Sequence, residues 1–211
     1  MKITLKVLLG VAIVLLAYMC YCSIIGPIEF DKERGRRESA IQARLIDIRT
    51  VQIEYRNLTG QYAGSFDELK KFLKETKLPS VRKEGVLSDE QLEQGMTEAE
   101  ALKKGIIKRD TTWVLAKDTL LGAGYNVDSL SFVPVAGVNA AFLLDTATLE
   151  SPAGYSVKVF ESGVKYDTYL FDLDRQQLVN LKDKMGKMGR YLGLRVGSVT
   201  EINNNAGNWE Q

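Results

Sequence analysis

The stretch IQARLIDIRTVQIEYRNLTGQYAGSFDEL, residues 41–69, decides the fold that we predict for the start of the chain. Its apolar residues recur at steps of three and four, which defines one stripe along a helix. The stripe consists of Ile41, Leu45, Ile48, Val51, Tyr55 and Leu58. Ile46 and Ile53 widen it, and this width suits packing against a domain or a partner helix. Gly60 fits the position just past a helix end, and Ser65 begins a capping box that opens a second helix.

The N-terminus of the sequence favours a membrane location. Residues 7–25 carry no charge, and the run is about long enough to cross a bilayer. Lys2 and Lys6 precede the run, whereas the flank after it mixes both signs, so the charge bias places the N-terminus inside. The run is longer than a cleaved signal peptide needs, and the residues before Cys20 and Cys22 match a lipoprotein signal poorly. We therefore expect an uncleaved signal-anchor in the lipid bilayer, with cleavage and lipidation as alternatives.

The composition argues against several classes of function. The 211 residues include 28 Lys and Arg and 27 Asp and Glu, so the net charge of +1 gives no reason to expect nucleic acid as a partner. The sequence has no histidine, which removes Ser-His and Cys-His nucleophile pairs and most zinc sites. No nucleophile motif or phosphate loop stands out. We expect no enzyme, and no catalytic, cofactor-binding or metal-binding residues.

The pattern changes along the rest of the chain. Residues 80–110 are polar, and capping boxes that begin at Ser88 and Thr97 predict one or two short helices there. From Thr111 on, short runs of Val, Leu, Tyr and Phe alternate with turn residues, which predicts strands. In the clearest pair of runs, GYSVKVFE and VKYDTYLFDL, Ser162-Gly163 is expected to form the turn of a hairpin. QQLVNL is expected to be a further strand.

These patterns together predict an α+β protein. An N-terminal transmembrane helix continues into a helical stem, and a small domain with a mostly antiparallel β-meander follows. Pro27 is expected to kink or restart the helix at the membrane exit. The expected segments are the cytoplasmic start with the signal-anchor, the stem with the second helix, the polar segment, the β-rich exported domain and a flexible tail. They comprise residues 1–27, 28–79, 80–110, 111–200 and 201–211.

Four short motifs read Asp, then Thr or Ser, then a methyl-bearing or aliphatic residue. They resemble the O-glycosylation sequon of exported proteins of the Bacteroidota, which would make their hydroxyl residues the modification sites. Asp-Thr and Asp-Ser pairs are also common at turns and strand edges, which is the alternative interpretation. The candidate residues are Thr111, Thr119, Ser129 and Thr146.

Two family resemblances bear on function. Residues 41–69 resemble the stem of pseudopilins and minor pilins, in which an apolar helix runs into an amphipathic one and a Gly-aromatic break follows. In prepilins a Gly directly precedes the apolar run and a Glu lies near its start, whereas here Gly10 is followed by VAIVL. TEAEALKKGIIKRDT, DSLSFVPV and the terminal GNWE resemble an uncharacterised family of single-pass envelope proteins of the Bacteroidota. That resemblance implies a membrane-anchored protein and no assigned activity.

We expect a single-pass inner-membrane protein with a cytoplasmic N-terminus and a periplasmic domain. The leading hypothesis is a non-enzymatic accessory or structural subunit of an envelope complex, of the secretion or energy-transduction type. Its partners would be other membrane or envelope proteins, bound through the stem stripe of Ile41 to Leu58. The alternatives are a membrane-tethered domain that binds or senses a ligand, and a minor-pilin-like subunit.

Overall fold

A computed structural model describes residues 2–84, 108–151 and 154–210, and single residues at 95, 97, 100, 102, 104 and 106. The chain forms two compact units, one of Met1–Gly64 with Ser131–Gln211 and one of Ser65–Leu130. Each unit combines helices with an antiparallel sheet, so the α+β class is confirmed. The second helix, expected beside the stem, belongs to the second unit, and the expected β-rich segment is divided between the two units.

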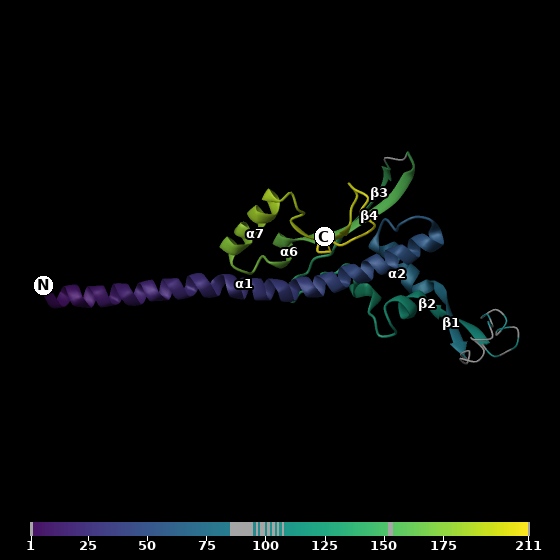
Figure 1. The fold of residues 1–211 in the computed structure, drawn as a ribbon, viewed down its shortest axis with the longest axis horizontal. Coiled ribbons are helices and arrows are strands. Elements are labelled where there is room, and N and C mark those ends of the chain that lie inside the picture. Colours follow the sequence, from purple (N-terminus) through teal and green to yellow (C-terminus); the bar gives the residue numbers. More distant parts are fainter. Residues whose placement is uncertain are drawn as a thin grey trace. The chain divides into compact units, whose positions relative to one another are not determined.

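The first unit is built on α1, one helix from Lys2 to Thr59 (Figure 1). The helix continues through Pro27, so the restart considered for that position does not occur. A proline removes a single backbone hydrogen bond, and helices with an apolar, membrane-type sequence tolerate it. Gly60 ends α1 with a φ of 77°, and its N–H donates to the carbonyl of Arg56 over 2.8 Å, as expected of a left-handed cap. Among the described residues, α1 is the one helix long and apolar enough to cross a membrane.

The second half of α1 lies in the core of this unit. It packs on strands β4 (Ser156–Lys165) and β5 (Gly193–Gly197) of a three-stranded antiparallel sheet with the order β3-β4-β5. Strand β3 comprises Leu143–Glu150. The side chains without exposed surface come from both layers and include Ile41, Leu45, Ile48, Val51, Phe160 and Val196. Each such side chain stabilises the fold by about 1.5–3 kcal/mol, so the apolar stripe holds the stem to its own sheet.

Strand β4 continues through the position where a hairpin turn was expected, and that prediction is wrong. Ser162 pairs with Leu144 on one side and with Val196 on the other. Gly163 lies in the same strand, and a Cβ added to it would lie 2.8 Å from the Cβ of Arg195. The glycine is therefore required for the close approach of two strands.

Two helices connect β4 to β5, where strands were expected. Helix α6 comprises Tyr166–Tyr169 and α7 comprises Arg175–Lys187. Asp174 caps α7, because its carboxylate accepts a hydrogen bond from the N–H of Gln177 over 2.8 Å. Leu178 and Leu181 are buried three residues apart, which is helical spacing, so the strand predicted for QQLVNL is wrong. The sheet keeps the antiparallel order of a meander, with both helices inserted before its last strand.

The second unit contains α2 (Phe66–Glu75), which begins as predicted. The N–H of Glu68 donates to the Ser65 hydroxyl over 3.3 Å, and Leu69, Phe72 and Leu73 are buried. Strands β1 (Lys77–Glu84) and β2 (Lys108–Leu115) form an antiparallel pair, and α5 (Ala116–Leu120) follows. Val127–Ser131 is a short 3-10 helix.

The capping box expected at Thr97 is present. The N–H of Thr97 donates to a carboxylate oxygen of Glu100, and the N–H of Glu100 donates to the Thr97 hydroxyl. The box expected at Ser88 lies outside the described residues.

The C-terminal segment is attached to the first unit by specific contacts, although a flexible tail was expected. Arg49 of α1 donates to both carboxylate oxygens of Glu210, at 2.9 and 3.0 Å. The side-chain amide of Asn208 donates to the carbonyl of Gly193, and its oxygen accepts from the N–H of Arg195. These contacts cover part of strand β5 with the chain end.

Candidate functional site

A buried arginine links the stem to the connection between α6 and α7. Arg37 donates to the two carboxylate oxygens of Asp172 at 2.5 and 2.8 Å, to the carbonyl of Tyr169 at 2.7 Å and to Glu33 at 2.8 Å. Only 9% of its side chain is exposed. We call Glu33, Arg37 and Asp172 the Arg37 clamp. Bidentate pairing of arginine with a carboxylate fixes orientation as well as distance, so the clamp holds the base of the domain rigidly against α1.

A second layer of polar contacts lies beside the clamp. The buried Tyr169 donates its hydroxyl hydrogen to Glu38 of α1 over 3.1 Å. Its ring centroid lies 6.0 Å from that of Tyr166, in the tilted arrangement that aromatic pairs prefer. Two polar links, Tyr169 to Glu38 and Arg37 to the Tyr169 carbonyl, thus join α6 to the stem, and the ring pair packs within α6.

The electrostatics of these groups follow from their partners and their burial. Hydrogen bonds from Arg36 and then Arg37 lower the pKa of Glu33 from 4.5 to about 2. The hydrogen bond from Arg37 also lowers the pKa of Asp172. Burial has the opposite effect on Glu38, whose pKa is raised above its ordinary value. The clamp is therefore an ion pair at neutral pH, whereas the fold disfavours the charged form of Glu38.

A small hollow of about 220 Å³ lies between α1 and α7. Arg34 contributes a guanidinium that is 3.3 Å from Asp31, and its buried Nε lies 3.8 Å from Glu38, too far for a hydrogen bond. The hollow has both apolar and polar side chains in its lining. The lining consists of Phe30, Asp31, Arg34, Gln177, Asn180, Leu181, Lys184 and Met185. We call it the α1–α7 hollow.

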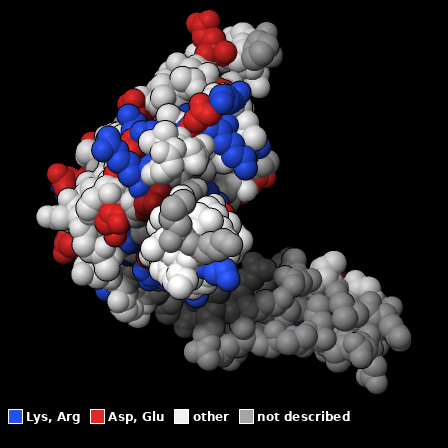
Figure 2. Space-filling model, turned by 90° about the vertical axis from the view of Figure 1, so that its left-hand side faces the viewer, with Lys and Arg blue, Asp and Glu red and all other residues white. Residues whose placement is uncertain are grey.

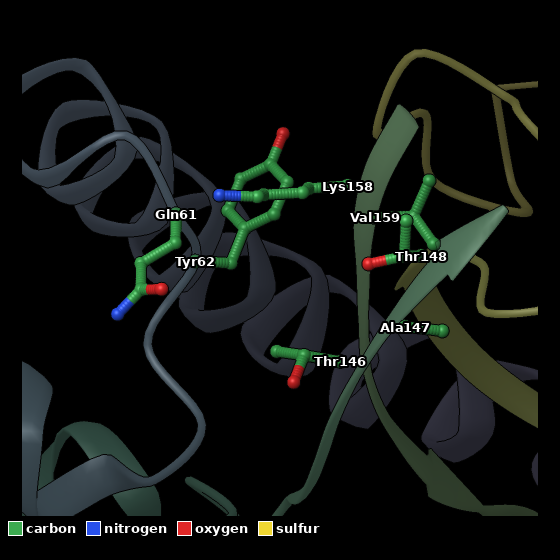
Figure 3. A pocket seen from close by; sticks show the side chains of 7 residues that line it. All are labelled: Gln61, Tyr62, Thr146, Ala147, Thr148, Lys158 and Val159. Atoms are coloured by element: carbon green, nitrogen blue, oxygen red, sulfur yellow. The ribbon is translucent and has the colours of Figure 1, made fainter. Parts of the chain in front are cut away.

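A second hollow, of about 280 Å³, lies between the segment after α1 and strands β3 and β4 (Figure 3). Figure 3 shows Lys158 reaching from β4 across Tyr62. The amine of Lys158 already donates to the carbonyl of Gly60 over 2.9 Å, and the Tyr62 hydroxyl accepts from Asn205 over 2.9 Å. The lining consists of Gln61, Tyr62, Thr146, Ala147, Thr148, Lys158 and Val159. A tethered ligand-binding domain would need aromatic side chains from the strands, and the single aromatic residue here comes from the segment after α1.

The residues of the predicted partner-binding stripe differ in how far they are buried. Ile41, Leu45, Ile48 and Val51 have no exposed surface, so they are core residues, and a partner cannot reach them in this fold. Tyr55 is half-buried, and Leu58 is 54% exposed. Burial corrects the expectation because the chain's own sheet covers the stripe. The apolar residues that remain accessible on this part of α1 are Ile46 and Ile53, each 39% exposed, and Leu58.

The candidate glycosylation residues lie in both units. Thr111, Thr119 and Thr146 are exposed, whereas Ser129 is half-buried and donates its hydroxyl hydrogen to the carbonyl of Asn126 over 2.7 Å. Asp145 accepts a hydrogen bond from the N–H of Thr146, which is the local role of Asp at a strand edge that the alternative interpretation expects. Access therefore favours the three threonines over the serine as modification sites.

The Arg37 clamp was missed by the sequence analysis. The spacing of Glu33 and Arg37 is the signal of a pair within one helix, but Asp172 lies 135 residues away. Among the described residues, no group of three or more His, Cys, Asp or Glu side chains is placed to hold a metal ion. No protein-family model, curated protein or solved structure matches the chain.

Proposed function

We propose that the chain is a single-pass inner-membrane protein that serves as a non-enzymatic structural or accessory subunit of an envelope complex. Its N-terminus is cytoplasmic, and its two folded units lie in the periplasm. The observation that carries the proposal is the continuity of α1 from Lys2 to Thr59. The first half of that helix is apolar and unburied, and the second half is the core of the first unit.

The Arg37 clamp supports this role. A domain on a flexible tether can act independently of its anchor, whereas this domain is joined to the anchor helix itself. The bidentate contact of Arg37 with Asp172 lies 12 residues beyond Ile25, the last residue of the expected membrane segment 7–25. Movement of the membrane helix is thereby transmitted directly to the sheet, which suits a subunit that positions other proteins.

Membrane integration is tested by fractionation of cells that contain the native chain. We expect the protein to stay with the membrane pellet after an alkaline carbonate wash, because an apolar helix of this length is held by the bilayer core. A cysteine placed at Ile202, which is exposed, is expected to react with a membrane-impermeant maleimide in intact spheroplasts. Release by carbonate, or protection of that cysteine until the cells are lysed, contradicts the proposed location.

Partner contacts are tested with a photo-crosslinking amino acid on α1. Ile46 and Ile53 are seven residues apart on one face and partly exposed, so a partner can reach them, as it can Leu58 near the helix end. We expect crosslinks to other membrane proteins from these positions, and only internal crosslinks from the buried Ile48. Intermolecular products from none of the three positions in native membranes would contradict a subunit role that uses the stem.

A second candidate, a minor-pilin-like subunit, is favoured by one observation. The apolar and amphipathic segments that resemble pseudopilins form one unbroken helix, which ends at Gly60. The two candidates differ at the N-terminus, because a pilin-like subunit is cleaved after a glycine. Mass spectrometry of the native N-terminal peptide distinguishes them: a chain that starts at Met1 supports the signal-anchored subunit, and one that starts at Val11 supports the pilin-like subunit.

A further inference from the structure

Positive charge is concentrated around α7. Residues 175–190 contain five basic side chains and one acidic one, a net charge of +4, whereas the whole chain carries +1. Two of the basic side chains are used within the protein, because Lys182 pairs with Asp167 and Lys187 pairs with Asp183. Arg175, Lys184 and Arg190 are exposed, and no ion pair within the described part of the chain includes them. The rest of the chain has a net negative charge, so this segment is a local exception.

The helix dipole does not account for this charge. Cations near the C-terminus of a helix interact favourably with its dipole, which explains Lys184 and Lys187 in the last turn. Arg175 lies in the first turn, where the dipole disfavours a cation, and Arg190 lies beyond the end of the helix. The dipole therefore leaves the exposed Arg175 and Arg190 unexplained.

The position of α7 indicates a ligand for these side chains. Phe30 and Arg34 of α1 line the α1–α7 hollow together with Lys184. Phe30 lies five residues beyond Ile25, the end of the expected membrane segment 7–25, which corresponds to about 7.5 Å along a helix. The headgroup layer of a bilayer extends about 5–7.5 Å beyond the hydrocarbon core. With α1 across the membrane, the hollow therefore lies at the outer surface of the headgroup layer.

The surface seen from the membrane end of α1 carries charges of both signs. Figure 2 views the molecule from the N-terminal end of that helix, and Lys and Arg side chains lie at the surface above the helix end, with acidic side chains between them. Figure 1 shows α7 beside the middle of α1. Two exposed apolar side chains accompany the basic ones, Val179 on α7 at 52% exposure and Met188 at its C-cap at 56%. Basic and apolar side chains together are typical of helices that contact a membrane surface.

We propose that α7 and the α1–α7 hollow bind the phosphate headgroups of anionic phospholipids in the bilayer that α1 crosses, through Lys184 and Arg190. The inference rests on the proposed membrane anchoring. Its consequence is that α1 and the domain that is clamped to it tilt together toward the surface of an anionic bilayer, so that lipid composition sets the orientation of the subunit.

The test uses the full chain with Cys20→Ala and Cys22→Ala, and a nitroxide on Met188→Cys, which is exposed one turn beyond Lys184 at the C-cap of α7. The protein is reconstituted in vesicles of phosphatidylcholine and in vesicles of equal parts phosphatidylcholine and phosphatidylglycerol. The access of a water-soluble paramagnetic reagent to the nitroxide reports docking of α7. We compare Lys184→Gln/Arg190→Gln with Lys71→Gln/Lys104→Gln, which removes the same charge from exposed positions of the second unit.

We expect the nitroxide to be protected in the anionic vesicles and accessible in the neutral ones. Each basic group near an anionic surface raises the ratio of docked to undocked protein about fivefold. The double variant at Lys184 and Arg190 is therefore expected to reduce this ratio about 25-fold. The control variant is expected to behave like the parent, and high salt to release α7 in both. Equal protection in the two kinds of vesicle, or protection that the Lys184/Arg190 variant retains, overturns the inference.

Flotation of the same vesicles after an alkaline wash separates this result from the proposed function. Protein that floats without composition-dependent protection refutes lipid binding by α7 and leaves the membrane anchor in place. Protein that does not float refutes the anchor, and lipid binding by α7 with it.

Discussion

Replacing Leu45 by Ala tests whether the stem belongs to the chain's own core. Leu45 has no exposed surface, and Ile41 and Ile48 on the same face of α1 are equally buried. Loss of a buried leucine destabilises proteins by about 2–5 kcal/mol, according to how far the cavity collapses. Here the neighbours belong to a helix and a sheet that cannot easily move inward, so we expect about 3–4 kcal/mol. Leu58→Ala is the matched control, because that leucine is 54% exposed and its loss should change stability by less than about 0.5 kcal/mol.

The assay is urea unfolding of the full chain in detergent micelles, followed by the fluorescence of Trp209. This tryptophan belongs to the first unit and its ring lies over Gly207, so its emission reports that unit, and Trp113→Phe removes the signal of the other unit. A Leu45→Ala variant within about 1 kcal/mol of the parent would refute the reasoning. It would mean that another chain covers the stripe, as the amphipathic pattern alone also allows.

Three further predictions concern the clamp, the pH dependence and modification. Arg37→Met should lower the free energy of unfolding of the first unit by about 2–3 kcal/mol. This is less than the loss typical of a broken buried ion pair, because water can reach the Asp172 carboxylate that is left behind. Arg36→Met is the control and should have little effect on the urea midpoint. The pKa of Glu38 is higher in the folded protein than in the unfolded one, so its contribution to stability is present below its unfolded pKa and is lost as the pH rises through its folded pKa. Glu38→Gln should therefore raise Tm at pH 7 and leave Tm unchanged near pH 3. The intact mass of the native protein should exceed the mass of its sequence by the mass of one or more glycans. Substitution of the exposed threonines should remove this additional mass, and Ser129→Ala should retain it. An intact mass equal to the sequence mass would refute this prediction. The threonines are Thr111, Thr119 and Thr146.

Local chemistry explains which elements the sequence predicted. The stop at Gly60 and the cap at Ser65 depend on residues within one turn of each other, and both are present. The buried stripe also follows from spacing alone. What covers the stripe could not be predicted, because an amphipathic helix has the same pattern whether its partner is a sheet of its own chain or another protein.

Two sequence-based predictions were wrong and one contact was missed. Gly163 was assigned to a turn, yet it lies in a strand because a side chain there would meet Arg195. The strand predicted for QQLVNL ignored a helix signal, since Asp174 followed by Gln177 has the spacing of a capped start. The Arg37 clamp required knowledge of the fold, because its two elements are distant in sequence and lie together only after the sheet has formed.

The continuity of α1 across Pro27 is the central claim, and one distance tests it most directly. Spin labels at Tyr18 and Ile46, both accessible on α1, are separated by 28 residues, which corresponds to about 42 Å along a straight helix. In a cysteine-free background reconstituted in nanodiscs, we expect double electron–electron resonance to give one narrow distribution near that distance. A broad distribution, or one centred well below about 35 Å, would show that the helix breaks at the membrane exit and would contradict a rigid link between anchor and domain.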